Sequence, residues 1–354
     1  MQGFAPAPTI PNNACFPFTL IDGGHLLKKP IEPLTGRVVR CILFDLGDTL
    51  WSRGDANTWW RLEAISNQRA VALLRKHIAN KFLPNLNDEE LGRRLHEAFN
   101  GCARAFIQHN PGLEANGPLA AIHTLQQWGI EGIDLDLATA IFEALRVRIP
   151  ESRPLFEDTL STLTGLQQRG FLLGIVTNRL WGGKPFQEDL QILSLLNYFD
   201  PPNIAVSADL GVRKPNPAIF LHALNALSVP PEQAVMVGDS LTADIAGGQA
   251  LGIFSVWKPK PKLWNQIQTS SGSTGDQQSF PQDPAPRSLD PSVDAPSTDA
   301  LSLGMHVTDD DYMLAQEEKY DTFLRDYLQG KTRPDLVIQH LSDLLDIFRE
   351  VGVQ

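Results

Sequence analysis

Four short motifs in the sequence combine residue types that can act on a phosphate ester. They are FDLGDTL at 44–50, IVTN at 175–178, GVRKPNP at 211–217 and VGDSLTAD at 237–244. A carboxylate can attack phosphorus covalently when a metal ion and hydrogen-bond donors neutralise the phosphoryl oxygens. Mg²⁺ prefers hard oxygen ligands and usually binds through one or two carboxylates, water and substrate phosphate. The motifs supply both carboxylates and donors.

Each motif offers a particular group for this chemistry. Asp45 and Asp239 would provide the carboxylates, and the backbone carbonyl of Gly47 would be a third oxygen for Mg²⁺. The hydroxyl of Thr177 and the ammonium of Lys214 would hold phosphate oxygens and counter the charge of Asp45. The sequence therefore predicts a nucleophile at Asp45, a metal site around it and a phosphate site opposite.

Neighbouring residues could support this arrangement. Asn178 follows Thr177 and is a further candidate for phosphate binding. Asp244 could orient Lys214 or the water ligands of the metal without binding the metal itself. Asp48 is compatible with a turn-stabilising role and with a catalytic one. Ordinary structural roles also remain open, because aspartates stabilise turns and a threonine at a strand end can cap the next helix.

Elements that alternate between strand and helix would position these motifs. Short apolar runs at 38–44, 171–176, 203–206, 234–237, 251–256 and 334–338 predict strands buried on both faces. Amphipathic spacing predicts helices at 155–168, 217–227 and 341–351. The fold class predicted is α/β, a doubly wound parallel (Rossmann-like) sheet, in which ligands bind beyond the carboxyl ends of the strands.

A long helical stretch interrupts this alternation. Helical spacing recurs at 59–74, 91–106, 118–128 and 135–147, and no convincing strand lies between them. An inserted all-helical module after the first strand is therefore expected. The predicted organisation is a flexible arm at 1–36, a core at 37–51, 149–258 and 333–354, the helical module at 52–148, and a largely disordered insertion at 259–332.

The four motifs, in this order and each behind an apolar strand, resemble the haloacid dehalogenase-like hydrolase superfamily. The resemblance covers roughly 38–258, and 334–350 is similar to the family's closing strand and helix. It implies that Asp45 is the nucleophile, that Thr177 and Lys214 bind phosphate, and that Asp239 is a magnesium ligand. The helical module is similar to the family's type 1 cap, which closes over the site and selects the substrate.

One position departs from the family's pattern. Its phosphatases usually carry a second Asp two residues after the nucleophile, as general acid and base, and this chain has Gly47 there. Asp48 lies one residue later, where its side chain points in a different direction. The metal site tolerates the change, because the family uses a backbone carbonyl at this position. What protonates the leaving group is therefore open.

Composition narrows the classes of partner. The formal charge of −11 argues against nucleic acid and anionic membranes, which favour basic surfaces. No stretch approaches the roughly 20 apolar residues of a membrane helix. The three cysteines are widely spaced, which is typical of a reducing compartment, and with no signal peptide recognisable the cytoplasm is expected.

The preferred interpretation is a magnesium-dependent phosphomonoester phosphatase acting on a small phosphorylated metabolite. Two alternatives stay open. One is different chemistry on the same fold, such as dehalogenation or carbon–phosphorus cleavage. The other is a catalytically impaired or regulatory protein, in which Gly47 marks lost catalysis.

Overall fold

The computed structural model describes residues 34–267 except 35, 53, 80, 81, 262 and 266, together with 327, 329–349, 352 and 353. The predicted N-terminal arm and the predicted disordered insertion therefore fall largely outside the described residues. The chain divides into two compact units, residues 1–259 with 332–354 and residues 260–331. The sheet and the helices that surround it belong to the first unit.

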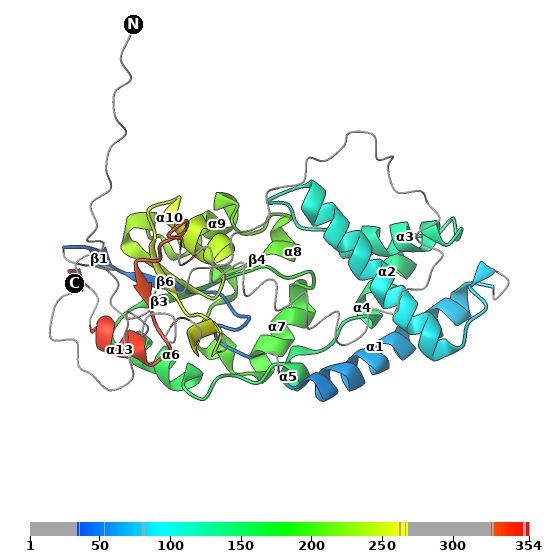
Figure 1. The fold of residues 1–354 in the computed structure, drawn as a ribbon, viewed down its shortest axis with the longest axis horizontal. Helices are drawn as coiled ribbons and strands as arrows, with labels where there is room; N and C mark the ends of the chain where they lie inside the picture. Colours follow the sequence, from blue (N-terminus) through cyan, green and yellow to red (C-terminus); the bar gives the residue numbers. More distant parts are fainter. Residues whose placement is uncertain are drawn as a thin grey trace, which may run out of the picture. The chain divides into compact units, whose positions relative to one another are not determined.

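Within the described residues the core is a six-stranded parallel sheet in the order β4-β3-β2-β5-β6-β7 (Figure 1). Its strands are β2 (Cys41–Phe44), β3 (Leu172–Thr177), β4 (Ile204–Val206), β5 (Ala234–Gly238), β6 (Phe254–Trp257) and β7 (Leu336–Val337). The chain starts at the centre, runs outward through β3 and β4, then crosses back and runs outward through β5. The order reverses between β2 and β5, and parallel sheets bind ligands at such a switch point. The predicted fold class is confirmed.

Helices cover both faces of this sheet. They are α5 (Ile149–Ser152), α6 (Thr159–Gln168), α7 (Gly183–Ile192), α8 (Ser207–Leu210), α9 (Pro217–Leu227), the π-helical turn η6 (Leu241–Ala246), α10 (Gly247–Gln249) and α13 (Asp343–Ile347). In Figure 1, α9 and α10 lie on one face, and α6 and α13 lie on the other.

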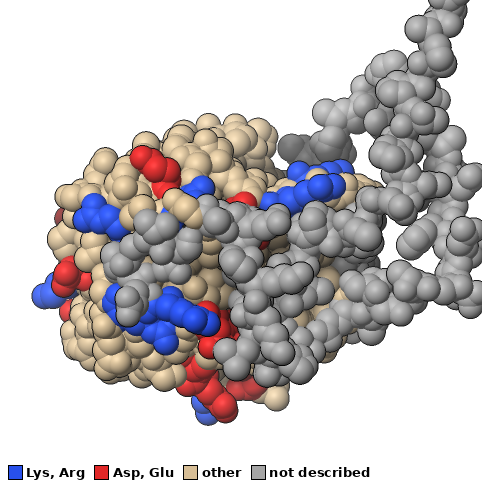
Figure 2. Space-filling view, turned by 90° about the vertical axis from the view of Figure 1, so that its left-hand side faces the viewer, with Lys and Arg blue, Asp and Glu red and all other residues tan. Residues whose placement is uncertain are grey.

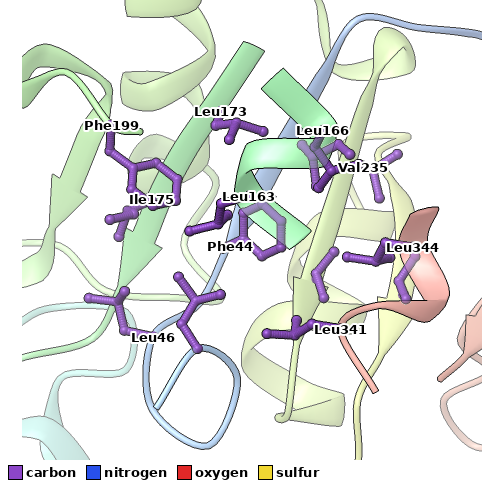
Figure 3. Packing of buried hydrophobic residues seen from close by; sticks show 14 of the residues in the cluster. Phe44, Leu46, Leu163, Leu166, Leu173, Ile175, Phe199, Val235, Leu341 and Leu344 are labelled. Atoms are coloured by element: carbon purple, nitrogen blue, oxygen red, sulfur yellow. The ribbon is translucent and has the colours of Figure 1, made fainter. Parts of the chain in front are cut away.

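The apolar sequence of β2 explains why both faces are covered. Successive side chains of a strand point to opposite faces. Ile42 and Phe44 join a buried cluster with Leu163 of α6, which Figure 3 shows from close by. Cys41 and Leu43 join a second cluster under α9. A strand without polar positions therefore has an apolar neighbour on each side.

The helical insert consists of α1 (Ala56–His77), α2 (Asp88–His109), α3 (Gly117–Gln127) and α4 (Leu135–Ala144), and follows β2 in the chain. Each helix begins after an Asp or Asn whose side-chain oxygen accepts a hydrogen bond from the backbone N–H three residues on. The capping residues are Asp55, Asn87, Asn116 and Asp134. Such caps satisfy a donor that the helix leaves unpaired. The insert packs around its own buried apolar cluster.

Three predicted elements differ from those observed. The run 38–44 divides, since β1 (Val38–Val39) pairs antiparallel with β8 (Gly352–Val353) instead of joining the main sheet. Helix α6 begins at Thr159 and not at 155. Leu155 instead forms an antiparallel bridge with Trp51, and these two residues lie in the two segments that connect the insert to the core. Helix α13 ends at Ile347, because the next residue, Phe348, turns into the core.

Charged side chains of both signs occur on the surface. On the described residues visible in Figure 2, basic and acidic side chains are interspersed. Among the helices that the structure describes, none is both long enough and apolar enough to cross a bilayer.

Two glycines of α2 give a matched test of how the insert is packed. A Cβ on Gly92 would lie 2.8 Å from the Cβ of Asn67 on α1, whereas one on Gly101 would meet nothing within 4 Å. Overpacking costs about 1–3 kcal/mol, while Gly to Ala at an open helix position stabilises by up to about 1 kcal/mol. We expect Gly92→Ala to lower the free energy of unfolding in urea and Gly101→Ala to raise it. Equal stability of the two variants would contradict the close packing of α1 on α2.

Candidate active site

The four motifs meet at the carboxyl edge of the sheet, next to the switch point. Asp45 directly follows β2, and its backbone N–H donates to the carbonyl of Val237 at 2.9 Å. Thr177 is the last residue of β3, and Asp239 follows β5. Three motifs thus end adjacent strands, so register alone places their polar residues side by side.

Lys214 completes the site from the third motif. Its buried Nζ donates hydrogen bonds of 2.6 Å to Asp45 Oδ1, to Asp244 Oδ1 and to the carbonyl of Val176. An ammonium has three protons to donate, and each finds an acceptor. The group is therefore fixed in position between two carboxylates.

Burial and neighbouring charge have opposite effects on the pKa of the Lys214 ammonium. Burial disfavours the ammonium, but the carboxylates of Asp244 and Asp45 outweigh it and raise the pKa of Lys214 above its ordinary value. Burial also raises the pKa of Asp244 to about 6, against the attraction of Lys214. The lysine thus stays charged at neutral pH, and Asp45 faces a permanent cation.

Asp244 fits tightly behind the end of β5. Its Oδ1 accepts from Lys214, and its Oδ2 accepts from the backbone N–H of Ser240 at 2.9 Å. A Cβ on Gly238 would lie 2.3 Å from Asp244 Cγ, so only glycine leaves room for the carboxylate. With both oxygens engaged, Asp244 is arranged to orient Lys214.

The acidic groups gather closely enough to hold a cation. One carboxylate oxygen each of Asp45, Asp239 and Asp244 lies within 4.8 Å of the others. Among the described residues, none donates a hydrogen bond to the second oxygen of Asp45, Oδ2. Hard oxygen donors converging from two loops suit a divalent cation such as Mg²⁺. The residues present therefore fit the metal that the motifs imply.

Thr177 and Asn178 take different positions. Thr177 is buried, and no described group hydrogen-bonds its hydroxyl. It caps no helix, since α7 begins at Gly183. The Asn178 amide instead clamps the backbone of Lys214, accepting from its N–H at 2.8 Å and donating to its carbonyl at 3.1 Å. Asn178 thus positions the lysine loop in this structure.

The loop after Asp45 is a tight turn. The backbone N–H groups of Leu50 and Trp51 both donate to the carbonyl of Leu46. Asp48 adopts the left-handed conformation, with φ of 57°, which aspartate tolerates better than most residues. A Cβ on Gly47 would meet only Asp45 Oδ2, at 3.9 Å, so space is left open beside the carboxylate.

Sequence reasoning missed Lys258, which supports this turn. Its buried ammonium donates to the carbonyl of Asp48 at 3.3 Å and lies 3.7 Å from the centroid of the Phe156 ring. Burial lowers the pKa of Lys258 below its usual value. The residue follows β6 outside the four motifs, so no spacing pattern could have indicated it.

Sequence reasoning also missed contacts from the insert to the lysine loop. The N–H of Glu114 donates to the carbonyl of Gly211, and the N–H of Arg213 donates to the carbonyl of Gly112, each at 3.0 Å. The carboxylate of Glu114 accepts a 2.5 Å hydrogen bond from Ser207. The insert is thereby joined to the segment that carries Lys214.

The buried cation gives a direct stability test. Removing one partner of a buried ion pair leaves an uncompensated charge and costs about 3–5 kcal/mol. We expect Lys214→Met to lower the free energy of unfolding by that amount at neutral pH, in EDTA so that no metal replaces the ammonium. The exposed Lys184 of α7 is the control, and Lys184→Met should change stability by less than about 0.5 kcal/mol. Equal effects of the two substitutions would contradict the role of Lys214.

Comparison with known proteins identifies the family of the chain. The haloacid dehalogenase-like hydrolase family matches residues 39–252. Two relatives are glyceraldehyde 3-phosphate phosphatases. That of Methanopyrus kandleri is 30% identical over 62% of this chain and 83% of the relative. That of Pyrococcus furiosus is 30% identical over 62% of this chain and 81% of the relative.

Among solved structures, a HAD phosphatase from Thermococcus onnurineus is 26% identical, covering 63% of this chain and 87% of its own, with a TM-score of 0.42. The family match spans more than half of the chain and contains all four motifs. The chain therefore belongs to the haloacid dehalogenase-like hydrolases.

Proposed function

We propose that the protein is a Mg²⁺-dependent phosphomonoester phosphatase that acts on a small phosphorylated metabolite through an aspartyl-phosphate on Asp45. The observation that carries the proposal is the Lys214 ammonium, 2.6 Å from Asp45 Oδ1. A fixed cation beside a carboxylate nucleophile lets an anionic phosphoryl group approach it. The archaeal relatives are named as phosphatases of a small phosphate ester, which supports the same proposal.

In the first step Asp45 Oδ2 attacks phosphorus. A bond forms between Oδ2 and phosphorus, and the bond from phosphorus to the ester oxygen breaks. The hydroxyl of Thr177 donates to a phosphoryl oxygen, and the positive charge of the Lys214 ammonium beside Asp45 stabilises the charge that develops on the phosphoryl oxygens. Mg²⁺, held by Asp45, Asp239 and the carbonyl of Gly47, would supply further neutralisation of these oxygens. Asp244 keeps Lys214 in place through its 2.6 Å hydrogen bond.

In the second step water attacks the phosphorus of the aspartyl-phosphate. The bond between phosphorus and Asp45 Oδ2 breaks, a proton of the attacking water passes to solvent, phosphate leaves, and the Asp45 carboxylate is restored. The alcohol that departs in the first step needs a proton, and Gly47 has no group to give one. Solvent would then supply this proton, so the rate should depend strongly on how good a leaving group the alcohol is. We further propose that the helical insert acts as the cap over this site.

Gly47 is also the observation that favours the alternatives, a dehalogenase or phosphonatase on the same fold or a protein with impaired catalysis. An Asp45→Asn variant, assayed for phosphate release from a panel of esters, separates them. We expect a loss of roughly 10³-fold or more, because the amide is a poor nucleophile. The exposed Asp136 of α4 provides the control, and Asp136→Asn should keep wild-type activity.

Removal of divalent cations from the wild type with EDTA should also abolish turnover, and Mg²⁺ should restore it. If Asp45→Asn is as active as the wild type, Asp45 is not the nucleophile. If the protein releases halide or cleaves a phosphonate but hydrolyses no phosphomonoester, it is a dehalogenase or a phosphonatase.

The missing acid can be restored by substitution. The open space beside Gly47 admits a side chain, since nothing closer than 3.9 Å meets an added Cβ. General acid catalysis is worth roughly 10²–10⁴-fold. We expect Gly47→Asp to raise kcat at least tenfold for alkyl phosphates, whose leaving alkoxides need a proton. Little change is expected for p-nitrophenyl phosphate, whose leaving phenolate needs none. An equal gain for both substrate types, or no gain for alkyl phosphates, would contradict this account of Gly47.

A further inference from the structure

Two adjoining cavities lie where the helical insert meets the core, each with a volume of about 250 Å³. Residues that line both are Asn100, Asn178, Arg179, Leu180 and Trp181. The second cavity is also lined by Trp59 of α1 and by Arg153, which lies between α5 and α6. Asn178, which clamps the backbone of Lys214, connects these cavities to the catalytic edge.

Arg179 is held rigidly in the shared wall. Its backbone N–H donates to Ser207 Oγ at 2.8 Å, and its Nε donates to the carbonyl of Trp181 at 3.3 Å. The guanidinium carbon lies 4.6 Å from the centroid of the Phe186 ring, which fixes the plane of the group. These contacts leave the two Nη atoms with no described carboxylate within ion-pair distance.

Charges of both signs surround the Arg179 guanidinium. The pKa of Arg179 is lowered to about 10, chiefly by burial. The charges of Arg153 and Arg146 act in the same direction, and those of Asp189 and Asp45 oppose them. The group therefore remains a cation at neutral pH, close enough to Asp45 for the two charges to interact. Among the described residues, no carboxylate lines the cavity that holds Arg179 and Arg153.

Among the nearby histidines and acidic groups, His96 and Glu114 line the cavities. Glu63 lines neither cavity, although its carboxylate lies 3.3 Å from His96 Nδ1. His96 lines the same cavity, but burial lowers its pKa to about 4, so it is neutral. Glu114 lines the adjoining cavity, where its carboxylate is already engaged by Ser207 and by Arg213 at 3.4 Å. Arg179 is partly buried and has no described carboxylate within ion-pair distance, so its guanidinium is available to bind an anion.

We propose that Arg179, with Arg153 beside it, binds a carboxylate of the substrate, so that the preferred substrates are short phosphorylated hydroxy acids. The proposal rests on the phosphatase function and adds the class of substrate. The planar fork of an arginine matches a carboxylate bidentately. The cavity beside Arg179 has a volume of about 250 Å³, which is room for a short carbon chain, and Arg179 lies close enough to Asp45 for their charges to interact.

Matched pairs of esters test the proposal. The first pair is 3-phosphoglycerate and glycerol 3-phosphate, and the second is 2-phosphoglycolate and 2-hydroxyethyl phosphate. Members of each pair differ by a carboxylate in place of a hydroxymethyl group. Hydrogen bonds to a charged group give discrimination of roughly 10–100-fold, so kcat/KM should favour each acid by about that factor.

Variants then assign the preference to Arg179. Arg179→Gln should bring the ratio within each pair close to one, by lowering kcat/KM for the acids more than for the neutral esters. Arg179→Lys keeps the charge without the fork and should give an intermediate ratio. The exposed Arg61 of α1 is the control, and Arg61→Gln should keep the wild-type ratio. Thermal unfolding of each variant identifies any loss of folding.

Equal kcat/KM values within both pairs for the wild type would overturn the proposal. An equal loss on both members in Arg179→Gln would also overturn it, because the arginine would then act on the phosphoryl group. Calorimetric binding of the same esters gives the comparison without turnover. If no phosphomonoester is hydrolysed, the proposed phosphatase function is wrong. The carboxylate site is still supported if the wild type binds each acid more tightly than its neutral partner and Arg179→Gln does not. If the wild type binds the acids and the neutral esters equally tightly, the carboxylate site is excluded.

Discussion

Two carboxylates that approach each other in a buried site repel unless a cation lies between them. In this protein that cation is Lys214, whose ammonium contacts Asp45, Asp244 and the carbonyl of Val176 at 2.6 Å each. Burying an ammonium is costly by itself, and three acceptors offset that cost. The position of the proposed nucleophile, the fit of a metal ion and the approach of an anionic substrate all depend on this arrangement.

The surrounding structure keeps the lysine in place from several directions. Asn178 clamps its backbone from the end of β3, and Gly238 leaves the space in which Asp244 sits behind β5. The insert contributes through the pairing of Leu113 with Val212, two residues before Lys214. The insert contacts both the lysine loop and the cavity around Arg179, so the proposed carboxylate site and the proposed catalytic groups share one set of contacts.

Much of this architecture could be predicted from the sequence, because β2 and β5 are short, uniformly apolar runs that end at a polar residue. Such runs indicate central parallel strands, and the residues after them meet at one edge. The helices of the insert were predictable from their spacing. The helix α13 was also predicted, but not its end at Ile347, because Phe348 leaves the helix to fill the core. Lys258 and Arg179 were missed because their roles arise from tertiary contacts with Asp48 and with the insert. The domain limits and the roles of the site residues stay predictions.

The central claim is that Asp45 becomes covalently phosphorylated during turnover. Rapid acid quenching of the wild type with a reactive phosphate ester, followed by borohydride reduction, converts an aspartyl-phosphate into homoserine that mass spectrometry can locate. The account predicts homoserine at position 45, formed only with substrate and absent in Asp45→Asn. Steady hydrolysis without modification of Asp45, or modification at another residue, would contradict it.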